Sequence, residues 1–113
     1  MAKVEIVESL KKEILRKFKK ESIEIFELMK SLENSPLKGK PIGQVGGLLI
    51  KELKYRSFRF YFIVDGNKIR VISEEKLKDL LIRFVRMSNK NNQQRVIEEI
   101  KHVLRLIGSD GFN

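Results

Sequence analysis

The chain lacks the residues on which several kinds of protein chemistry depend. Its 113 residues include no cysteine, no tryptophan, one histidine and two prolines. Without cysteine there is no disulfide framework, and a zinc site of the Cys–His type cannot be assembled from His102 alone. A nucleophile activated by histidine would also have to depend on His102. We therefore expect no metal ion and no cofactor.

Long apolar runs and a targeting segment are also missing. The purely apolar stretches last only a few residues, and the opening Met-Ala-Lys-Val-Glu is not a signal peptide. These absences predict a cytoplasmic protein without a membrane span. The length and the 42% apolar content suit one small domain, residues 1–113, and exclude a multidomain enzyme.

Acidic residues are scarce in two segments. The chain holds 24 Lys and Arg against 15 Asp and Glu, a net charge of +9. Residues 38–59 carry six basic side chains against Glu52, a net of +5, and residues 80–95 carry four with no acid. The rest of the chain is neutral in sum, so these two segments carry the whole imbalance. Such a pattern favours a polyanionic partner over a neutral small molecule.

The N-terminal third predicts a short strand followed by a helical hairpin. Residues 3–6 alternate apolar and charged side chains, which is typical of a strand. Apolar residues four apart predict an amphipathic helix from Ser9 to about Lys19. A second apolar stripe predicts another helix with Ser22 as its N-cap, which Asn34-Ser35-Pro36 ends.

The remaining residues predict a loop, a sheet and a final helix. Residues 36–47 hold both prolines and four glycines, so we predict a loop there. Strands of an antiparallel meander are then predicted at 48–54, 58–65, 68–73 and 80–86, with a turn at Asp65-Gly66-Asn67. A polar loop over 88–94 leads to a helix that Gly108 ends. The fold class is α+β: a short N-terminal strand and a helical hairpin packed on a twisted antiparallel sheet, with a C-terminal helix.

The strand over 58–65 directs attention to one face of this sheet. Alternation places Phe58, Phe60, Phe62 and Val64 against the helices and leaves Arg59 and Tyr61 on the other, open face. Arg83 shares that face if its neighbours Ile82 and Phe84 pack inward. The same parity turns Arg86 inward unless the strand ends before it, and the spacing leaves both possibilities open.

An open face with these residues suits phosphate and RNA. Arginine presents a planar fork to phosphoryl oxygens, and tyrosine can stack on a base. The predicted set is completed by Lys51 or Lys54 nearby and by Arg86 and Lys90 at the lip. Such a site either binds RNA or cleaves it, because attack of a ribose 2′-OH on its phosphate needs a base, an acid and cations but no metal.

Several short motifs occur together in the middle of the chain. They are the Leu37-Lys38-Gly39 loop after the helical hairpin, the segment 47–53, and the strand centre with Arg59 and Tyr61. In this order they resemble the RelE/ParE toxin superfamily. Residues 81–90 followed by 97–101 resemble the HigB branch. The resemblance spans residues 3 to 107.

The resemblance implies a toxin of a type II toxin–antitoxin pair that acts as an mRNA interferase at the ribosome. It implies mRNA, the ribosome and an acidic antitoxin as partners. Carried over by position, the catalytic residues are Lys51, Lys54, Arg59, Tyr61 and Arg86. Further basic residues of the two acid-poor segments are predicted RNA contacts: Arg56, Arg83, Lys90 and Arg95. On this interpretation Arg59 and Arg86 hold the scissile phosphate, Lys51 or Lys54 handles protons, and Tyr61 supports or stacks.

Two alternatives stay open. Met87 stands where the HigB-like pattern has a second lysine, no late tyrosine or histidine follows, and about ten extra residues surround 73–79. A catalytically silent relative fits these departures as well. ParE-like members of the same fold inhibit DNA gyrase instead, and a non-enzymatic basic RNA- or DNA-binding module would have the same charge pattern.

Overall fold

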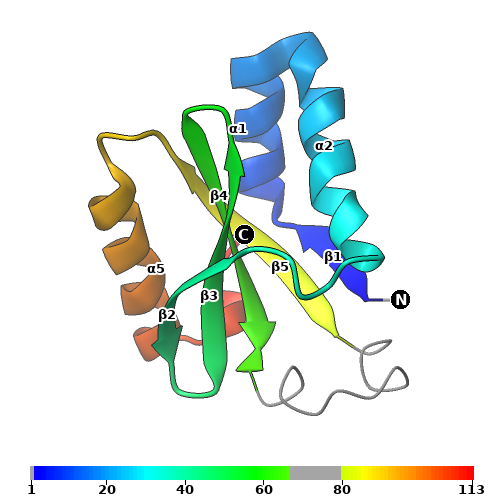
Figure 1. Ribbon diagram of the computed structural model, residues 1–113. Coiled ribbons are helices and arrows are strands. Elements are labelled where there is room, and N and C mark those ends of the chain that lie inside the picture. The colour runs from blue at the N-terminus through cyan, green and yellow to red at the C-terminus, as the bar shows by residue number, and fades with distance from the viewer. Residues whose placement is uncertain (1, 67–79) are drawn as a thin grey trace.

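The structure is a computed structural model that describes residues 2–66 and 80–113 (Figure 1). Within those ranges the elements are β1 Lys3–Ile6, α1 Glu8–Phe18, α2 Ser22–Lys30, β2 Lys40–Val45, β3 Leu48–Tyr55, β4 Phe58–Asp65, β5 Leu81–Ser88 and α5 Gln93–Leu106. Short 3₁₀ turns occupy Lys19–Glu21, Ser31–Glu33 and Ser109–Gly111. The predicted α+β class is confirmed. The predicted strand at 68–73, and Asn67 of the predicted turn, lie outside the described residues.

The described strands form one mixed sheet in the order β1-β5-β4-β3-β2. Strands β2 to β5 pair antiparallel with their neighbours, whereas β1 lies parallel to β5, with Lys3 opposite Leu81. The sequence predicted an antiparallel sheet, and the β1–β5 pair is the exception to it. A parallel pair needs a long connection between its strands, and here most of the chain provides it.

The helical hairpin is confirmed, with one correction. Leu10 and Ile14 of α1 and Ile25 and Met29 of α2 are fully or almost fully buried, as their spacing predicts. Ser22 was predicted to cap α2, but its hydroxyl donates to the backbone oxygen of Ile14 at 3.2 Å. The serine therefore ties the two helices together instead of satisfying the N–H groups at the start of the second.

The predicted loop over residues 36–47 is wrong for residues 40–45, which form the edge strand β2. Pro41 is tolerated there because a proline on an edge strand removes no hydrogen bond that the sheet needs on its open side. The β2–β3 register shifts between Pro41 and Gly43. The residues that favour a loop by composition, Pro41 and Gly43, thus lie at an irregular point of the ladder.

Both faces of the sheet are covered, which the sequence did not predict. Figure 1 shows the sheet lying between the α1–α2 pair and α5. The ring of Phe18 in α1 is 5.0 Å from that of Phe58 between centroids, on the face that also holds the buried Phe60. On the other face α5 packs against β5 and β2, and Tyr61 and Ile63 are buried as well. The predicted open face of β4 is thus closed over much of its length.

No helix in the described part of the chain is both long enough and apolar enough to cross a membrane.

Candidate nucleic-acid interface

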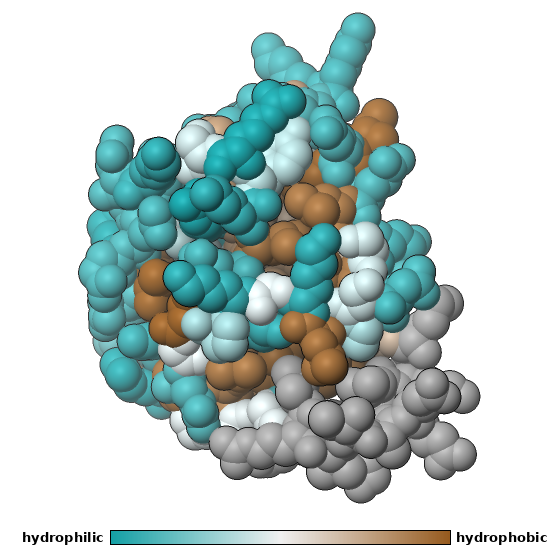
Figure 2. Space-filling model, viewed as in Figure 1, coloured by the Kyte–Doolittle hydropathy of each residue, from teal (hydrophilic) through white to brown (hydrophobic). Residues whose placement is uncertain are grey.

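A basic cleft opens where β2 begins, β3 ends and β4 begins. Its volume is about 460 Å³, and its lining consists of Lys38, Gly39, Lys40, Glu52, Leu53, Lys54 and Arg59. Four cationic side chains there surround one carboxylate. Figure 2 shows that hydrophilic side chains dominate the upper part of the face seen in Figure 1, where the turn between β3 and β4 lies.

Strand register explains why these charges meet. Lys40 is opposite Glu52 in the β2–β3 ladder, and Lys54 is opposite Arg59 in the β3–β4 ladder. Residues directly opposite each other share a face, and so do residues two apart on one strand. Glu52 and Lys54 therefore link the two pairs into one cluster across three strands.

Arg59 forms the fixed floor of the cleft. Its side chain is 11% exposed, its Nε lies 3.8 Å from Oε1 of Glu52, and its Nη1 donates to the carbonyl of Phe58 at 3.2 Å. The Glu52 side chain is 13% exposed. Lys38, Lys40 and Lys54 are exposed. The arrangement offers a held guanidinium for a phosphate and solvated ammonium groups around it.

Lys51 lies away from this cluster, although the resemblance implies the same role for Lys51 or Lys54. Its register partner is Phe62, so its side chain lies on the opposite face of β3 from Lys54. It is 4% exposed, and its Nζ donates to the carbonyl of Leu37 at 2.9 Å. Burial lowers the pKa of Lys51. Of the two lysines proposed as proton carriers, Lys54 alone lines the cleft.

Tyr61 is not placed to stack on a base. It is fully buried, and its hydroxyl shares a hydrogen bond of 2.7 Å with Oγ of Ser88. Burial raises the pKa of Tyr61. Because α5 covers this face of the sheet, the predicted exposed position of the ring is wrong.

Arg86 lies on the same face as Tyr61, because the β4–β5 ladder contains a bulge. Phe62 pairs with Phe84 and Tyr61 pairs with Arg86, so Val85 is an extra residue that reverses the parity. The Nε of Arg86 donates to Oε1 of Glu99 in α5 at 3.1 Å. Its guanidinium also lies 4.9 Å from the ring centroid of Phe112. These contacts hold Arg86 against α5, and it is not among the residues that line the cleft.

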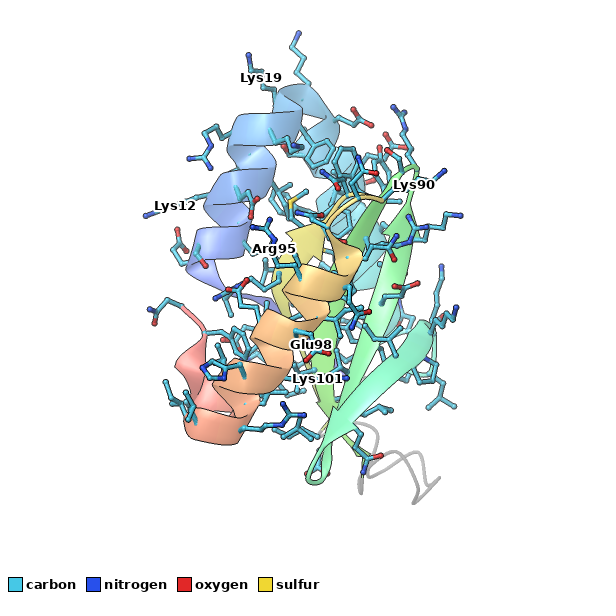
Figure 3. All side chains as sticks on the ribbon, turned by 90° about the vertical axis from the view of Figure 1, so that its left-hand side faces the viewer. Lys12, Lys19, Lys90, Arg95, Glu98 and Lys101 are labelled. Carbon is cyan, nitrogen blue, oxygen red and sulfur yellow. The ribbon has the colours of Figure 1, made fainter. Side chains whose placement is uncertain are left out.

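The other predicted RNA contacts are dispersed. Arg56 occupies the β3–β4 turn, is exposed, and pairs with Glu21 at 2.9 Å. Arg83 is turned toward the C-terminal segment, where Nη1 donates to the carbonyl of Ser109 at 2.8 Å. Figure 3 shows Lys90 and Arg95 near the N-terminal end of α5, and both are exposed. Arg56 is thus close along the chain to the strands that line the cleft. Arg83 lies near the start of β5, at the end of that strand away from the cleft.

Three charged residues of the cleft do not belong to the predicted site: Lys38, Lys40 and Glu52. The sequence pattern predicts a loop for the two lysines, and Glu52 enters the prediction only through the net charge of residues 38–59. The alternation of Glu52 with Lys54 on a predicted strand was a signal that they share a face. Nothing in the sequence showed that β2 would bring Lys40 opposite Glu52.

In residues 2–66 and 80–113, no three histidine or carboxylate side chains come together in a way that could hold a metal ion. A scan against protein-family models, a search of curated proteins and a search of solved structures gave no match. The resemblance to the RelE/ParE superfamily therefore stays a prediction, and the cleft is interpreted from its own chemistry.

Proposed function

We propose that this protein is an endoribonuclease that cuts mRNA, the toxin of a type II toxin–antitoxin pair in the cytoplasm. The observation that carries the proposal is the pairing of a nearly buried guanidinium, Arg59, with the carboxylate of Glu52 inside a cleft rimmed by lysines. Single-stranded RNA supplies both a phosphate for the cations and a 2′-OH for the carboxylate.

Different residues of the cleft bind the phosphate, accept a proton and donate a proton. Arg59 and Lys54 bind the scissile phosphate and stabilise the negative charge that develops on its oxygens. Glu52 accepts the proton of the 2′-OH as that oxygen attacks the neighbouring phosphorus. A protonated lysine of the rim, Lys38 or Lys40, gives a proton to the departing 5′-oxygen. The products are a 2′,3′-cyclic phosphate and a 5′-hydroxyl end.

The partners follow from charge. A net charge of +9 favours the ribosome and mRNA as binding partners, and it favours an acidic antitoxin that covers the basic surface. Extended acidic chains of this kind fold on binding, because alone they bury too little apolar surface.

A second candidate is a basic RNA-binding module that cleaves nothing. It is favoured by the positions of Lys51, Tyr61 and Arg86, three of the five residues that the resemblance made catalytic. Two are buried, and the third is paired with Glu99. On this alternative the cleft holds phosphate, and Glu52 only orients Arg59.

The test is cleavage of a defined mRNA, with and without translating ribosomes, mapped by primer extension. Glu52→Gln keeps the shape of the cleft and removes the proton acceptor. We expect cuts with the native protein and none with Glu52→Gln, while RNA binding by Glu52→Gln is equal or tighter because a negative charge is gone. Glu27→Gln, which removes an exposed carboxylate on α2, is the matched control and should cut normally.

The two candidates give different results. Cleavage that survives Glu52→Gln contradicts the proposed mechanism. Binding without cleavage by the native protein under both conditions supports the non-catalytic module, and a gyrase inhibition assay then tests the ParE-like alternative.

A further inference from the structure

The segment between α2 and β2 crosses the sheet on its way to the cleft. Figure 1 shows it passing in front of β4 and β3 before β2 begins. Lys38 lies in this segment, and Lys40 follows as the first residue of β2. The position of two of the four cleft cations therefore depends on what holds the crossing in place.

A turn hydrogen bond from the Lys38 N–H to the carbonyl of Ser35, at 3.1 Å, lies within the segment. Two further contacts join it to the sheet. The ammonium group of Lys51 donates to the carbonyl of Leu37, the residue immediately before Lys38, at 2.9 Å. Gly39 follows with φ of +107°, and a Cβ on it would lie 2.6 Å from Cζ of Phe62. The backbone thus rests directly on an aromatic ring, in a conformation that glycine adopts without strain.

Lys51 and Phe62 belong to the same arrangement. They are opposite each other in the β3–β4 ladder, and Nζ of Lys51 lies 5.8 Å from the ring centroid of Phe62. The backbone of Lys51 is also the register partner of Pro41. The side chain of Lys51 therefore holds the segment that crosses the sheet. Its backbone, in β3, pairs with β2, the strand into which that segment leads.

The buried ammonium group of Lys51 is not expected to add to the free energy of unfolding. Removing it from water is costly, and an unbranched apolar side chain of similar length would fill the site without that cost. Its hydrogen bond instead fixes one carbonyl at one place. A cation held in the geometry in which it meets its ligand loses less conformational entropy on binding than one on a free segment.

We infer that Lys51 is a positioning residue for the cleft, which fixes the Leu37 carbonyl so that Lys38 and Lys40 face the RNA phosphates. The inference rests on the proposed function for the identity of the ligand. It assigns Lys51 a different role from the proton carrier that the sequence suggested, because the residue acts through the segment above it and touches no substrate.

The test is a double-mutant cycle on binding of a short single-stranded RNA, measured as a function of salt. In the native background, Lys38→Ala should lower the slope of log affinity against log salt by about one, the loss of one phosphate contact. In the Lys51→Met background the slope should already be lower, and Lys38→Ala should change it little. Lys54→Thr is the control, since Lys54 sits on β3 itself and should have the same effect in both backgrounds.

An equal effect of Lys38→Ala in both backgrounds overturns the inference. It would mean that the contribution of Lys38 to RNA binding does not depend on Lys51. If Lys51→Met fails to fold, Gly39→Ala disturbs the same segment through Phe62 and should weaken the Lys38 contribution in the same way. Normal coupling in that variant also contradicts the positioning role.

Hydrogen exchange separates this inference from the proposed function. Lys51→Met should speed exchange of the amides of residues 38–40 at least tenfold and leave the amides of β4 unchanged. If the native protein binds no RNA but this selective loss of protection appears, the proposed function fails and the Lys51 contact stands. Unchanged exchange at residues 38–40 overturns the inference whatever RNA does.

Discussion

Lys54 and Arg59 are directly opposite each other in the β3–β4 ladder. Like charges in this position destabilise a sheet, here by a few tenths of a kcal/mol because the Lys54 side chain is exposed to water. Lys54→Thr should therefore leave the free energy of unfolding unchanged or raise it by about 0.5 kcal/mol, while RNA binding weakens. Urea denaturation and an RNA titration measure the two effects. A loss of stability above about 1 kcal/mol would contradict this interpretation, since surface substitutions rarely exceed that.

Arg59→Ala should behave differently, because the charge it leaves behind is nearly buried. Removing one partner of a charged contact costs about 1–3 kcal/mol when the other stays out of water, and the Glu52 side chain is 13% exposed. The double variant Arg59→Ala with Glu52→Gln should recover part of that loss. A cycle of chemical denaturation measurements checks this, and strictly additive losses would mean that the two groups do not interact.

Tyr61→Phe should lower stability and leave RNA cleavage intact. The substitution removes the hydroxyl that pairs with Ser88, which is itself 2% exposed, at a cost of about 1 kcal/mol. Thermal unfolding and the primer-extension assay measure both properties. An inactive variant of native stability would return Tyr61 to the catalytic set.

Alkaline pH should weaken the contact between the hairpin turn and the helices. The hydroxyl of Tyr55 donates to Glu21, and this hydrogen bond, with burial, raises the pKa of Tyr55 to about 12. In the unfolded chain the phenol ionises near pH 10. The raised pKa stabilises the fold fully below that value, and the stabilisation is lost progressively as pH rises from about 10 toward 12.

Tyr55→Phe isolates this effect. The difference in unfolding free energy between the native protein and the variant should be constant below about pH 9 and should shrink above pH 10. The lowered pKa of Lys51 acts in the opposite sense, but it is present in both proteins and cancels in the difference. A difference that grows with pH would contradict the assignment.

Phe60→Ala should be among the most destabilising single changes. Phe60 is fully buried, with its ring centroid 6.3 Å from Phe18 and 6.4 Å from Tyr55. Truncation of such a ring costs about 3–5 kcal/mol. Leu106→Ala, at a side chain that is 70% exposed, is the control and should stay within about 0.5 kcal/mol. Chemical denaturation distinguishes the two.

The helical parts of the fold could be predicted because their apolar residues recur with the helical period. Leu10 and Ile14 share one face of α1, and Val96, Ile100 and Leu104 share one face of α5. Strand β2 could not be found in this way. Pro41 and the glycines around it favour a loop locally, and pairing with β3 overrides that preference.

The candidate site was predicted in part, and the errors have two physical causes. Prediction by alternation assumes an unbroken ladder. Val85 is an extra residue in the β4–β5 ladder, so alternation assigns Arg86 to the wrong face. Alternation also cannot show whether a second layer covers a strand. The apolar run from Phe60 to Val64 was a signal of burial on both sides, since strands covered on two faces carry such continuous runs. Lys54 and Arg59 were found because neither effect touches them.

The parallel pairing of β1 with β5 has a consequence for folding. Lys3 and its partner Leu81 are far apart along the chain, whereas β3 and β4 are neighbours joined by a tight turn. The local β3–β4 hairpin therefore forms early and β1 joins β5 late, because closing so long a stretch of chain is entropically slow. Until β1 has joined, the edge of β5 is open to pairing with other chains. We therefore expect aggregation during refolding to depend on how fast this one strand pair closes.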